Sequence, residues 1–138
     1  MEQIEELSKL LVEFFEKFSS WETGVVRGKP LTLSQIHAVE ILNSQGVLKM
    51  KELAEKMGVT TGTLTVLVDR LEKAGLVERR PHETDRRSIR VLLTDRGLSI
   101  AQEHHKLHRR LTQELTSSMS KEEISSLVGH LKKMLGSF

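Results

Sequence analysis

Residues 49–97 constrain the fold of this chain more than any other part, because the order of their four predicted short elements is typical of one motif. A short helix, KELAEKM, is followed by a tight turn at Gly58 and by a second predicted helix over residues 61–74. Two segments rich in apolar and branched residues, 76–80 and 88–93, are typical of strands. A helix, a turn, a second helix and a charged hairpin in this order predict a winged helix-turn-helix.

The second helix of this motif has one apolar and one polar face. Leu64, Leu67, Val68 and Leu71 recur at spacings of three and four, which places them on one face and predicts that they are buried. Thr60 or Thr61 can cap the start of the helix, and Gly75 stands where a left-handed residue ends one. The other face carries Gly62, Thr63, Val66, Asp69, Arg70 and Lys73. An ordinary amphipathic surface helix would look similar, so its neighbours decide its function.

With those neighbours, the polar face is typical of a helix that reads the major groove of DNA. Threonine hydroxyl and methyl groups meet base edges, and an apolar side chain meets a thymine methyl group. Arg70 and Lys73, farther along the helix, are better placed for phosphates. The predicted DNA-binding residues of the helix and its cap are Thr60, Thr61, Thr63, Thr65, Val66, Arg70 and Lys73.

The hairpin that follows is strongly basic. From residue 79 to residue 90 there are five Arg against two acidic residues, Glu83 and Asp85, in a chain whose formal net charge is only +2. A charged loop is usually just a solvated surface. Directly after a predicted recognition helix, positive charge on a protruding loop instead indicates contact with a phosphate backbone or a minor groove.

Composition limits the alternatives. With 138 residues, 38% of them hydrophobic, we expect one domain with a modest core. No apolar run reaches membrane-spanning length, and the first residues, MEQIEELSK, lack the pattern of a signal peptide. We therefore expect a cytoplasmic protein with no membrane partner. The chain has no Cys, which excludes disulfides, thiolate metal ligands and thiol-based switches.

The flanking segments are predicted to be helical and to mediate dimerisation. Thr32 with Gln35, and Ser120 with Glu123, form capping boxes, and Thr94 can cap a long helix. We predict dimerisation helices at about 2–22, 94–117 and 120–136 around a winged helix-turn-helix at about 32–93, all in one domain over residues 1–138. A short domain cannot bury long terminal helices by itself, so we expect a homodimer. The first helix has an apolar stripe of Ile4, Leu7, Leu11, Phe14, Phe15 and Phe18.

The chain resembles the MarR family of transcription regulators over nearly its whole length. The resemblance rests on LTLSQIHAVEIL, the helix-turn-helix, VDRLEKAGLVERR and the wing DRRSIRVLLTDRG, with Asp85, Arg87, Leu93, Thr94 and Gly97 at the motif positions. It implies a mainly α fold with a small β-hairpin. It also implies that the protein is a homodimeric transcription regulator, acting as a repressor, and not an enzyme. Recognition helices would occupy successive major grooves of a pseudo-palindromic double-stranded operator, with wings over the minor grooves. It also implies that Asp85 braces the wing, while Arg86 and Arg87 reach the DNA.

Histidines on the long helix indicate a metal effector. His104 and His108 lie on a stripe with Ala101, Leu111 and Leu115, so both are expected to point inward and can share a metal ion. His37 on the second helix and Glu22 at the end of the first would complete a tetrahedral zinc site, with Glu103 and Glu40 less favoured than Glu22. An inward His is also often a satisfied polar group of a core or a dimer interface.

The same residues resemble a zinc-dependent branch of the MarR family. In that branch a His of the second helix, a Glu-His-x-x-x-His of the long helix and a Glu of the first helix hold the metal. Glu103, His104, His108 and His37 match this pattern. The position of the first-helix Glu falls on Gly24, so Glu22 is chosen by proximity. The branch's second site uses a Cys, which this chain lacks, so we expect one site at most.

Three other functions remain open at this stage. Many members of the family bind small aromatic or phenolic anions and then release DNA, and Trp21, Phe18 and the same His residues could line such a pocket. A metallohydrolase could use the three His residues around zinc, but the chain has neither an HExxH motif nor a phosphate-binding glycine loop. A dimerisation or scaffold module would lack the salt-dependent DNA affinity that the wing arginines predict.

Overall fold

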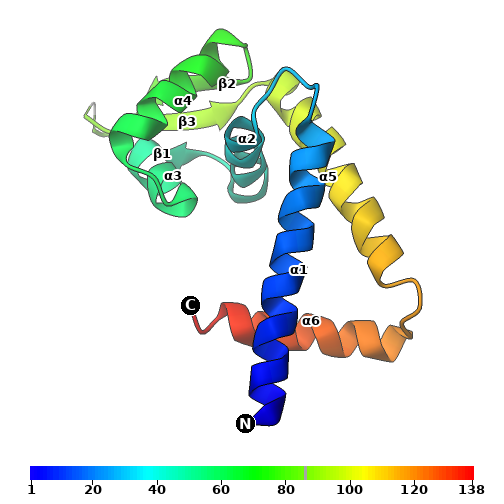
Figure 1. The fold of residues 1–138 in the computed structure, drawn as a ribbon. Helices are drawn as coiled ribbons and strands as arrows, with labels where there is room; N and C mark the ends of the chain where they lie inside the picture. Colours follow the sequence, from blue (N-terminus) through cyan, green and yellow to red (C-terminus); the bar gives the residue numbers. More distant parts are fainter. Residues whose placement is uncertain (86) are drawn as a thin grey trace. The chain divides into compact units, whose positions relative to one another are not determined.

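The computed structural model describes residues 1–85 and 87–138, which form six helices and a three-stranded sheet (Figure 1). The chain divides into two compact units, Met1–Ala101 and Gln102–Phe138. The helices are α1 (Glu2–Val26), α2 (Leu33–Gln45), α3 (Met50–Met57), α4 (Thr61–Lys73), α5 (Asp95–Leu115) and α6 (Lys121–Leu135). The strands are β1 (Leu48–Lys49), β2 (Val77–Pro81) and β3 (Ile89–Leu93). The predicted mainly α fold is confirmed.

Local sequence signals set most helix ends where they were predicted. Thr32 and Gln35 make a reciprocal capping box at α2, as do Ser120 and Glu123 at α6. Each box satisfies N–H groups that a helix start leaves without an intrahelical partner. The first helix ends later than predicted, at Val26 rather than near residue 22. Residues 23–26 contain no proline that would end the helix earlier. The first proline of the chain, Pro30, lies in the loop before α2.

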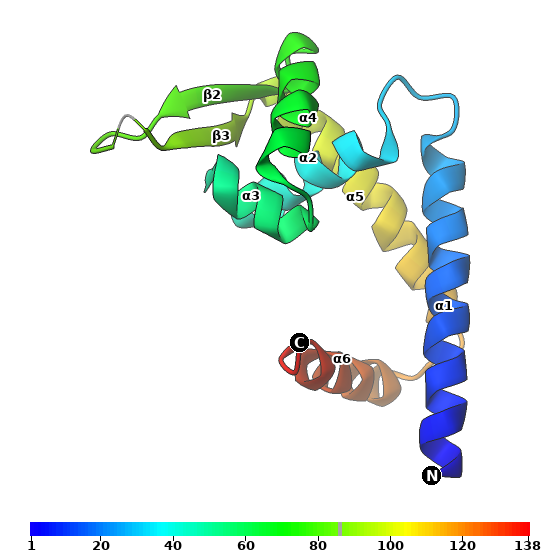
Figure 2. The same cartoon turned by 60° about the vertical axis from the view of Figure 1, so that its left-hand side comes forward.

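The sheet has one strand more than the predicted hairpin. Its order is β1-β3-β2, and both pairings are antiparallel. In β1, Leu48 pairs with Val91 of β3, while Val77 of β2 pairs with Leu93. Figure 2 shows β2 and β3 extending as a hairpin away from α4. We call this hairpin, with the residues between its strands, the wing.

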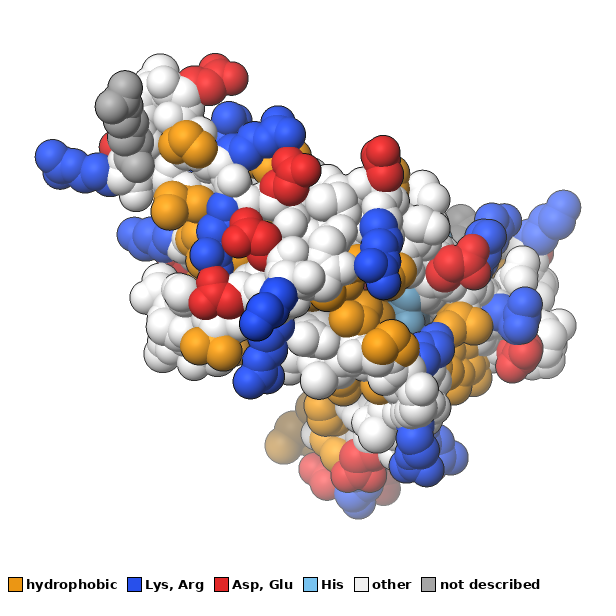
Figure 3. Space-filling view, turned by 90° about the horizontal axis from the view of Figure 1, so that it is seen from above, with side chains coloured by type: hydrophobic (Ala, Val, Ile, Leu, Met, Phe, Trp, Pro, Cys, Tyr) orange, Lys and Arg blue, Asp and Glu red, His pale blue; other side chains and the backbone are white. Residues whose placement is uncertain are grey.

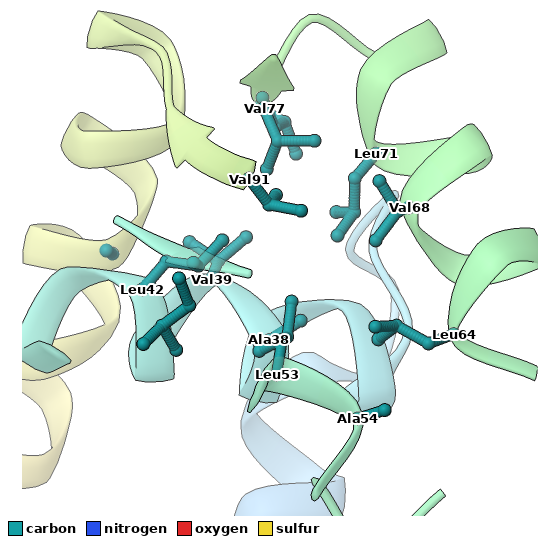
Figure 4. Close-up of a cluster of buried hydrophobic side chains, with 13 residues drawn as sticks. Ala38, Val39, Leu42, Leu53, Ala54, Leu64, Val68, Leu71, Val77 and Val91 are labelled. Atoms are coloured by element: carbon teal, nitrogen blue, oxygen red, sulfur yellow. The ribbon is translucent and has the colours of Figure 1, made fainter. Parts of the chain in front are cut away.

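The core of the first unit lies between α2, α3, α4 and the sheet (Figure 4). Three of the four α4 residues predicted to be buried, Leu64, Val68 and Leu71, are completely so, whereas Leu67 is half-buried. Each fully buried aliphatic side chain contributes about 1.5–3 kcal/mol relative to exposure. This packing fixes the inner face of α4 and leaves its outer face to solvent.

The terminal helices leave large apolar faces uncovered in the single chain. Neither α1 nor α6 has a fully buried residue. Exposed apolar residues of α1 are Ile4, Leu7, Leu10, Leu11, Val12, Phe14 and Phe15, and those of α6 are Ile124, Leu127, Val128, Leu131, Met134 and Leu135. Among the described residues, no helix is both long enough and apolar enough to span a membrane.

Candidate nucleic-acid interface and metal-ligand groups

The outer face of α4 presents the predicted DNA-reading residues to solvent. Thr61, Thr63, Thr65, Arg70 and Lys73 are exposed, and more than half of the Val66 surface is accessible. An exposed apolar side chain on such a face can meet a thymine methyl group in a major groove.

Thr60 has a different role from the other threonines. Its hydroxyl accepts the backbone N–H of Thr63 at 3.1 Å and donates to the Thr63 hydroxyl at 3.0 Å. Thr60 therefore caps α4 and fixes its first turn.

Both ends of α4 are held by neighbouring elements of the first unit. At the start, Gly58 adopts a left-handed conformation (φ 68°) in the turn between α3 and α4. Past the end of α4, Thr94, which directly precedes α5, and Arg96 in its first turn donate to three consecutive carbonyl groups. The Arg96 guanidinium donates to Ala74 O at 3.1 Å, the Thr94 hydroxyl to Gly75 O at 2.6 Å and the Thr94 N–H to Leu76 O at 3.0 Å.

Most wing arginines that the structure describes pair with acidic side chains. Arg80 pairs with Glu78 at 2.9 Å and Arg90 with Glu83 at 4.0 Å. Arg79 turns to α4 and pairs with Asp69. Basic and acidic side chains accordingly lie side by side in the space-filling view (Figure 3). The count of five arginines therefore overstates the charge available to DNA.

Arg87 differs from the other wing arginines. It is exposed, and among the described residues its guanidinium has no acidic partner. The Asp85 carboxylate accepts the Arg87 backbone N–H at 3.0 Å and so holds the turn that presents this side chain. Arg86, the other predicted wing contact, lies outside the described residues.

The two histidines of the predicted metal site lie together in the second unit. His104 is buried and His108 half-buried, so both avoid full exposure as predicted. Their Nε2 atoms are 3.1 Å apart and their ring centroids 4.9 Å apart. At this separation one ring donates a hydrogen bond and the other accepts it. A metal ion could replace that proton with little movement of either ring.

Two carboxylates lie together in the first unit. An oxygen of Glu22 and one of Glu40 are within 4.8 Å of each other. Burial raises the pKa of Glu40 to about 7, and the neighbouring Glu22 carboxylate adds to the rise. A cation beside the pair would favour the ionised form of both carboxylates.

Within α2, His37 and Glu40 differ in exposure, although three residues separate them. His37 is exposed, whereas Glu40 is half-buried and stands one turn after the buried Ile36. Glu40, and not His37, has its carboxylate beside that of Glu22. Sequence reasoning ranked Glu40 low. The spacing of four from Ile36 is the signal that could have raised it.

Residues 31–89 match the model of the MarR family. The HTH-type transcriptional regulator YfiV of Bacillus subtilis is 37% identical over 110 residues, which cover 76% of this chain and 68% of YfiV. The chain belongs to the MarR family.

Solved structures of MarR proteins agree with the assignment. A MarR family protein from Bacillus stearothermophilus has 30% identity and a TM-score of 0.89, with 99% of this chain and 95% of that chain covered. A mutant MarR from Escherichia coli, solved in complex with operator DNA, has 29% identity and a TM-score of 0.73, with 96% of each chain covered. The predicted MarR-type DNA-binding regulator, rather than an enzyme, is thereby confirmed.

Proposed function

We propose that this MarR protein is a homodimeric repressor of a pseudo-palindromic, double-stranded operator, acting in the cytoplasm where that DNA lies. The observation that carries the proposal is the outer face of α4, which exposes Thr61, Thr63, Thr65 and Val66 on a helix held at both ends. The E. coli MarR mutant solved with operator DNA supports it.

The proposed contacts divide by chemistry. Thr61, Thr63, Thr65 and Val66 meet base edges in the major groove, with Thr60 fixing the first turn of α4. Phosphate contacts come from Arg70 and Lys73 near the end of α4. Arg86 and Arg87 extend the contact from the wing to the minor groove.

A second copy of the chain is the proposed partner of the uncovered apolar faces of α1 and α6. Soluble monomers rarely expose contiguous apolar patches of this kind. A twofold axis gives each half-site its own recognition helix, with half-sites about 34 Å apart. The proposed organisation is one domain over residues 1–138, in which α1, the later turns of α5, and α6 mediate dimerisation.

Zinc is the proposed effector, held by His104 and His108 of one unit and by Glu22 and Glu40 of the other. Two imidazoles and two carboxylates fit the tetrahedral nitrogen and oxygen preferences of zinc. This set replaces the predicted His37 with Glu40, because Glu40 rather than the exposed His37 groups with Glu22.

Such a link would make DNA binding depend on the metal. Glu22 and Glu40 belong to the unit that carries α4, while His104 and His108 lie in the other unit. Ligands from both units would fix the orientation of each recognition helix. A small rotation of either helix would prevent both half-sites from being engaged at once. The metal acts to the extent that it binds the DNA-competent arrangement more tightly, which makes it a corepressor.

The experiment measures zinc affinity by chelator competition, and DNA affinity on a duplex that the protein itself selects from a randomised pool. We expect about one zinc per chain and tighter DNA binding with zinc. His104→Ala and His108→Ala should lose zinc binding and the zinc response of DNA affinity but retain the fold. His105→Ala, an exposed change on the same helix, is the matched control.

Two further variants identify the fourth ligand. Glu40→Gln should weaken zinc affinity, whereas His37→Ala should not; the reverse result would restore the ligand set predicted from sequence. Unchanged zinc affinity in both His104→Ala and His108→Ala would refute the site. DNA binding that ignores zinc and chelator but is released by a small aromatic acid such as salicylate would make an organic anion the effector.

A further inference from the structure

Arg79, in the middle of β2, contacts the recognition helix rather than solvent. Its Nη2 donates to the backbone carbonyl of Thr65 at 3.2 Å and to the Asp69 carboxylate. Its backbone N–H donates to Oε2 of Glu72 at 3.2 Å, and its Nη1 lies 4.0 Å from Oε1 of the same residue. Only 25% of the Arg79 side chain is exposed, against 60% for Arg80.

The strand geometry explains why this arginine faces inward. Alternate residues of a strand share a face, so Arg79 lies on the same side of β2 as Val77, which is buried against the core. From there the guanidinium reaches α4. Asp69 and Glu72 neutralise its charge, which leaves little of that charge for a DNA phosphate.

The contacts of Arg79 fall on a part of α4 that core packing does not hold. Leu64, Val68 and Leu71 fix the inner face, whereas Thr65 and Asp69 are exposed residues one turn apart. Thr65 is adjacent to Val66 on the proposed DNA-reading surface. An arginine fork gives directional hydrogen bonds that apolar packing lacks. Its bonds to two successive turns oppose rotation of α4 about its own axis.

We propose that Arg79 is a positioning residue that locks the recognition helix to the wing, and that it does not itself contact DNA phosphate. The wing and α4 then move as one rigid unit, so that the wing reaches the minor groove only when α4 lies in the major groove. This inference rests on the proposed function, because it assigns α4 and the wing to the operator.

Salt dependence distinguishes a positioning residue from a phosphate contact. Each phosphate contact that is lost lowers the slope of log affinity against log salt concentration by about 0.9. Affinity is measured across salt concentrations for the selected duplex and for a random duplex of equal length. Arg79→Met should bind the selected duplex about tenfold more weakly, as expected for losing charge-assisted hydrogen bonds. Its salt slope and random-duplex affinity should match the wild type, whereas Arg87→Ala should lower the slope.

A double-mutant cycle with Asp69→Asn gives a second readout. If Arg79 acts through Asp69, Arg79→Met/Asp69→Asn should bind the selected duplex no more weakly than Arg79→Met alone. Thermal unfolding confirms that each variant is folded at the assay temperature. If Arg79→Met does not fold, Asp69→Asn alone tests the inference. This variant should fold, because Asp69 is more than half exposed. It should then lower the preference for the selected duplex without lowering the slope.

Each contrary result has a distinct meaning. An Arg79→Met slope reduced as in Arg87→Ala would make Arg79 a phosphate contact and overturn the inference. An unchanged preference for the selected duplex in both Arg79→Met and Asp69→Asn would also overturn it. A wild-type protein that binds selected and random duplexes equally would overturn the proposed function, and the inference with it.

Discussion

Glu40 places an ionisable carboxyl group in a half-buried position beside Glu22. Burial, followed by the Glu22 charge, raises the pKa of Glu40 from 4.5 to about 7. Between these values the folded protein keeps a proton that the unfolded chain has released. The stability that this proton provides is therefore present below pH 4.5 and is lost as the pH rises through about 7.

Glu40→Gln should remove this pH dependence, because the amide stays neutral. In the presence of a chelator, we expect its free energy of unfolding to vary less between pH 5 and pH 8 than that of the wild type. At pH 8 it should exceed the wild-type value by on the order of 1 kcal/mol, after allowance for solvent screening. Urea unfolding across this range is the measurement. Glu22→Gln removes only the smaller cause and should retain most of the dependence; equal pH profiles for Glu40→Gln and wild type would contradict this account.

At this scale, sequence periodicity predicted which side chains face inward but not what they meet. It placed His104 and His108 away from water, and the alternation in β2 already put Arg79 on the buried side of its strand. The partners of Arg79 are seven, ten and fourteen residues away, on a different element. Likewise, the choice between His37 and Glu40 depends on which of two neighbouring positions of α2 is covered by other residues, and that is a tertiary property.

At the scale of elements, the start of α5 packs against the segment that follows α4, and the backbones are too close there for a side chain at Gly97. Gly97 lies in the first turn of α5, and a Cβ atom there would come within 2.0 Å of the Leu76 carbonyl oxygen. Leu76 O is also the acceptor of the Thr94 N–H. A methyl group at this position must therefore push the start of α5 away from the end of the recognition helix.

Gly97→Ala should consequently destabilise the protein, although alanine is the better helix former. We expect a loss of about 1–3 kcal/mol in the free energy of unfolding, the usual cost of overpacking, and weaker binding to the selected duplex. Gly24→Ala is the matched control, because its Cβ atom meets nothing within 4 Å. It should gain up to about 1 kcal/mol from helix propensity. Chemical denaturation of both variants is the measurement, and a stabilised Gly97→Ala would refute the close contact.

Which elements sequence could predict depends on how local their causes are. The starts of α2, α4 and α6 depend on side chains within three residues of the cap, so all three were predictable. β1 was not, because its two residues form a strand only by pairing with Arg90 and Val91, more than forty positions along the chain. A segment that short has no periodicity to detect.

At the scale of the whole molecule, the apolar faces of α1 and α6 have no partner within their own units that buries them. Association with a second copy would remove these faces from water. Because dimers form by mass action, the unfolding temperature of a dimer rises with protein concentration. The wild type should show this rise and should sediment as a dimer at micromolar concentration.

A charge within either face should convert the protein to a monomer. Burying an unpaired carboxylate in an interface costs several kcal/mol, so Leu11→Glu in α1 and Leu131→Glu in α6 should each prevent association. Their unfolding temperatures should then be independent of concentration. DNA affinity should fall on a duplex with two half-sites and remain weak on one half-site, because a monomer brings only one recognition helix. Glu13→Gln, an exposed change on α1, controls for altered charge, and a monomeric wild type would refute the proposed dimer outright.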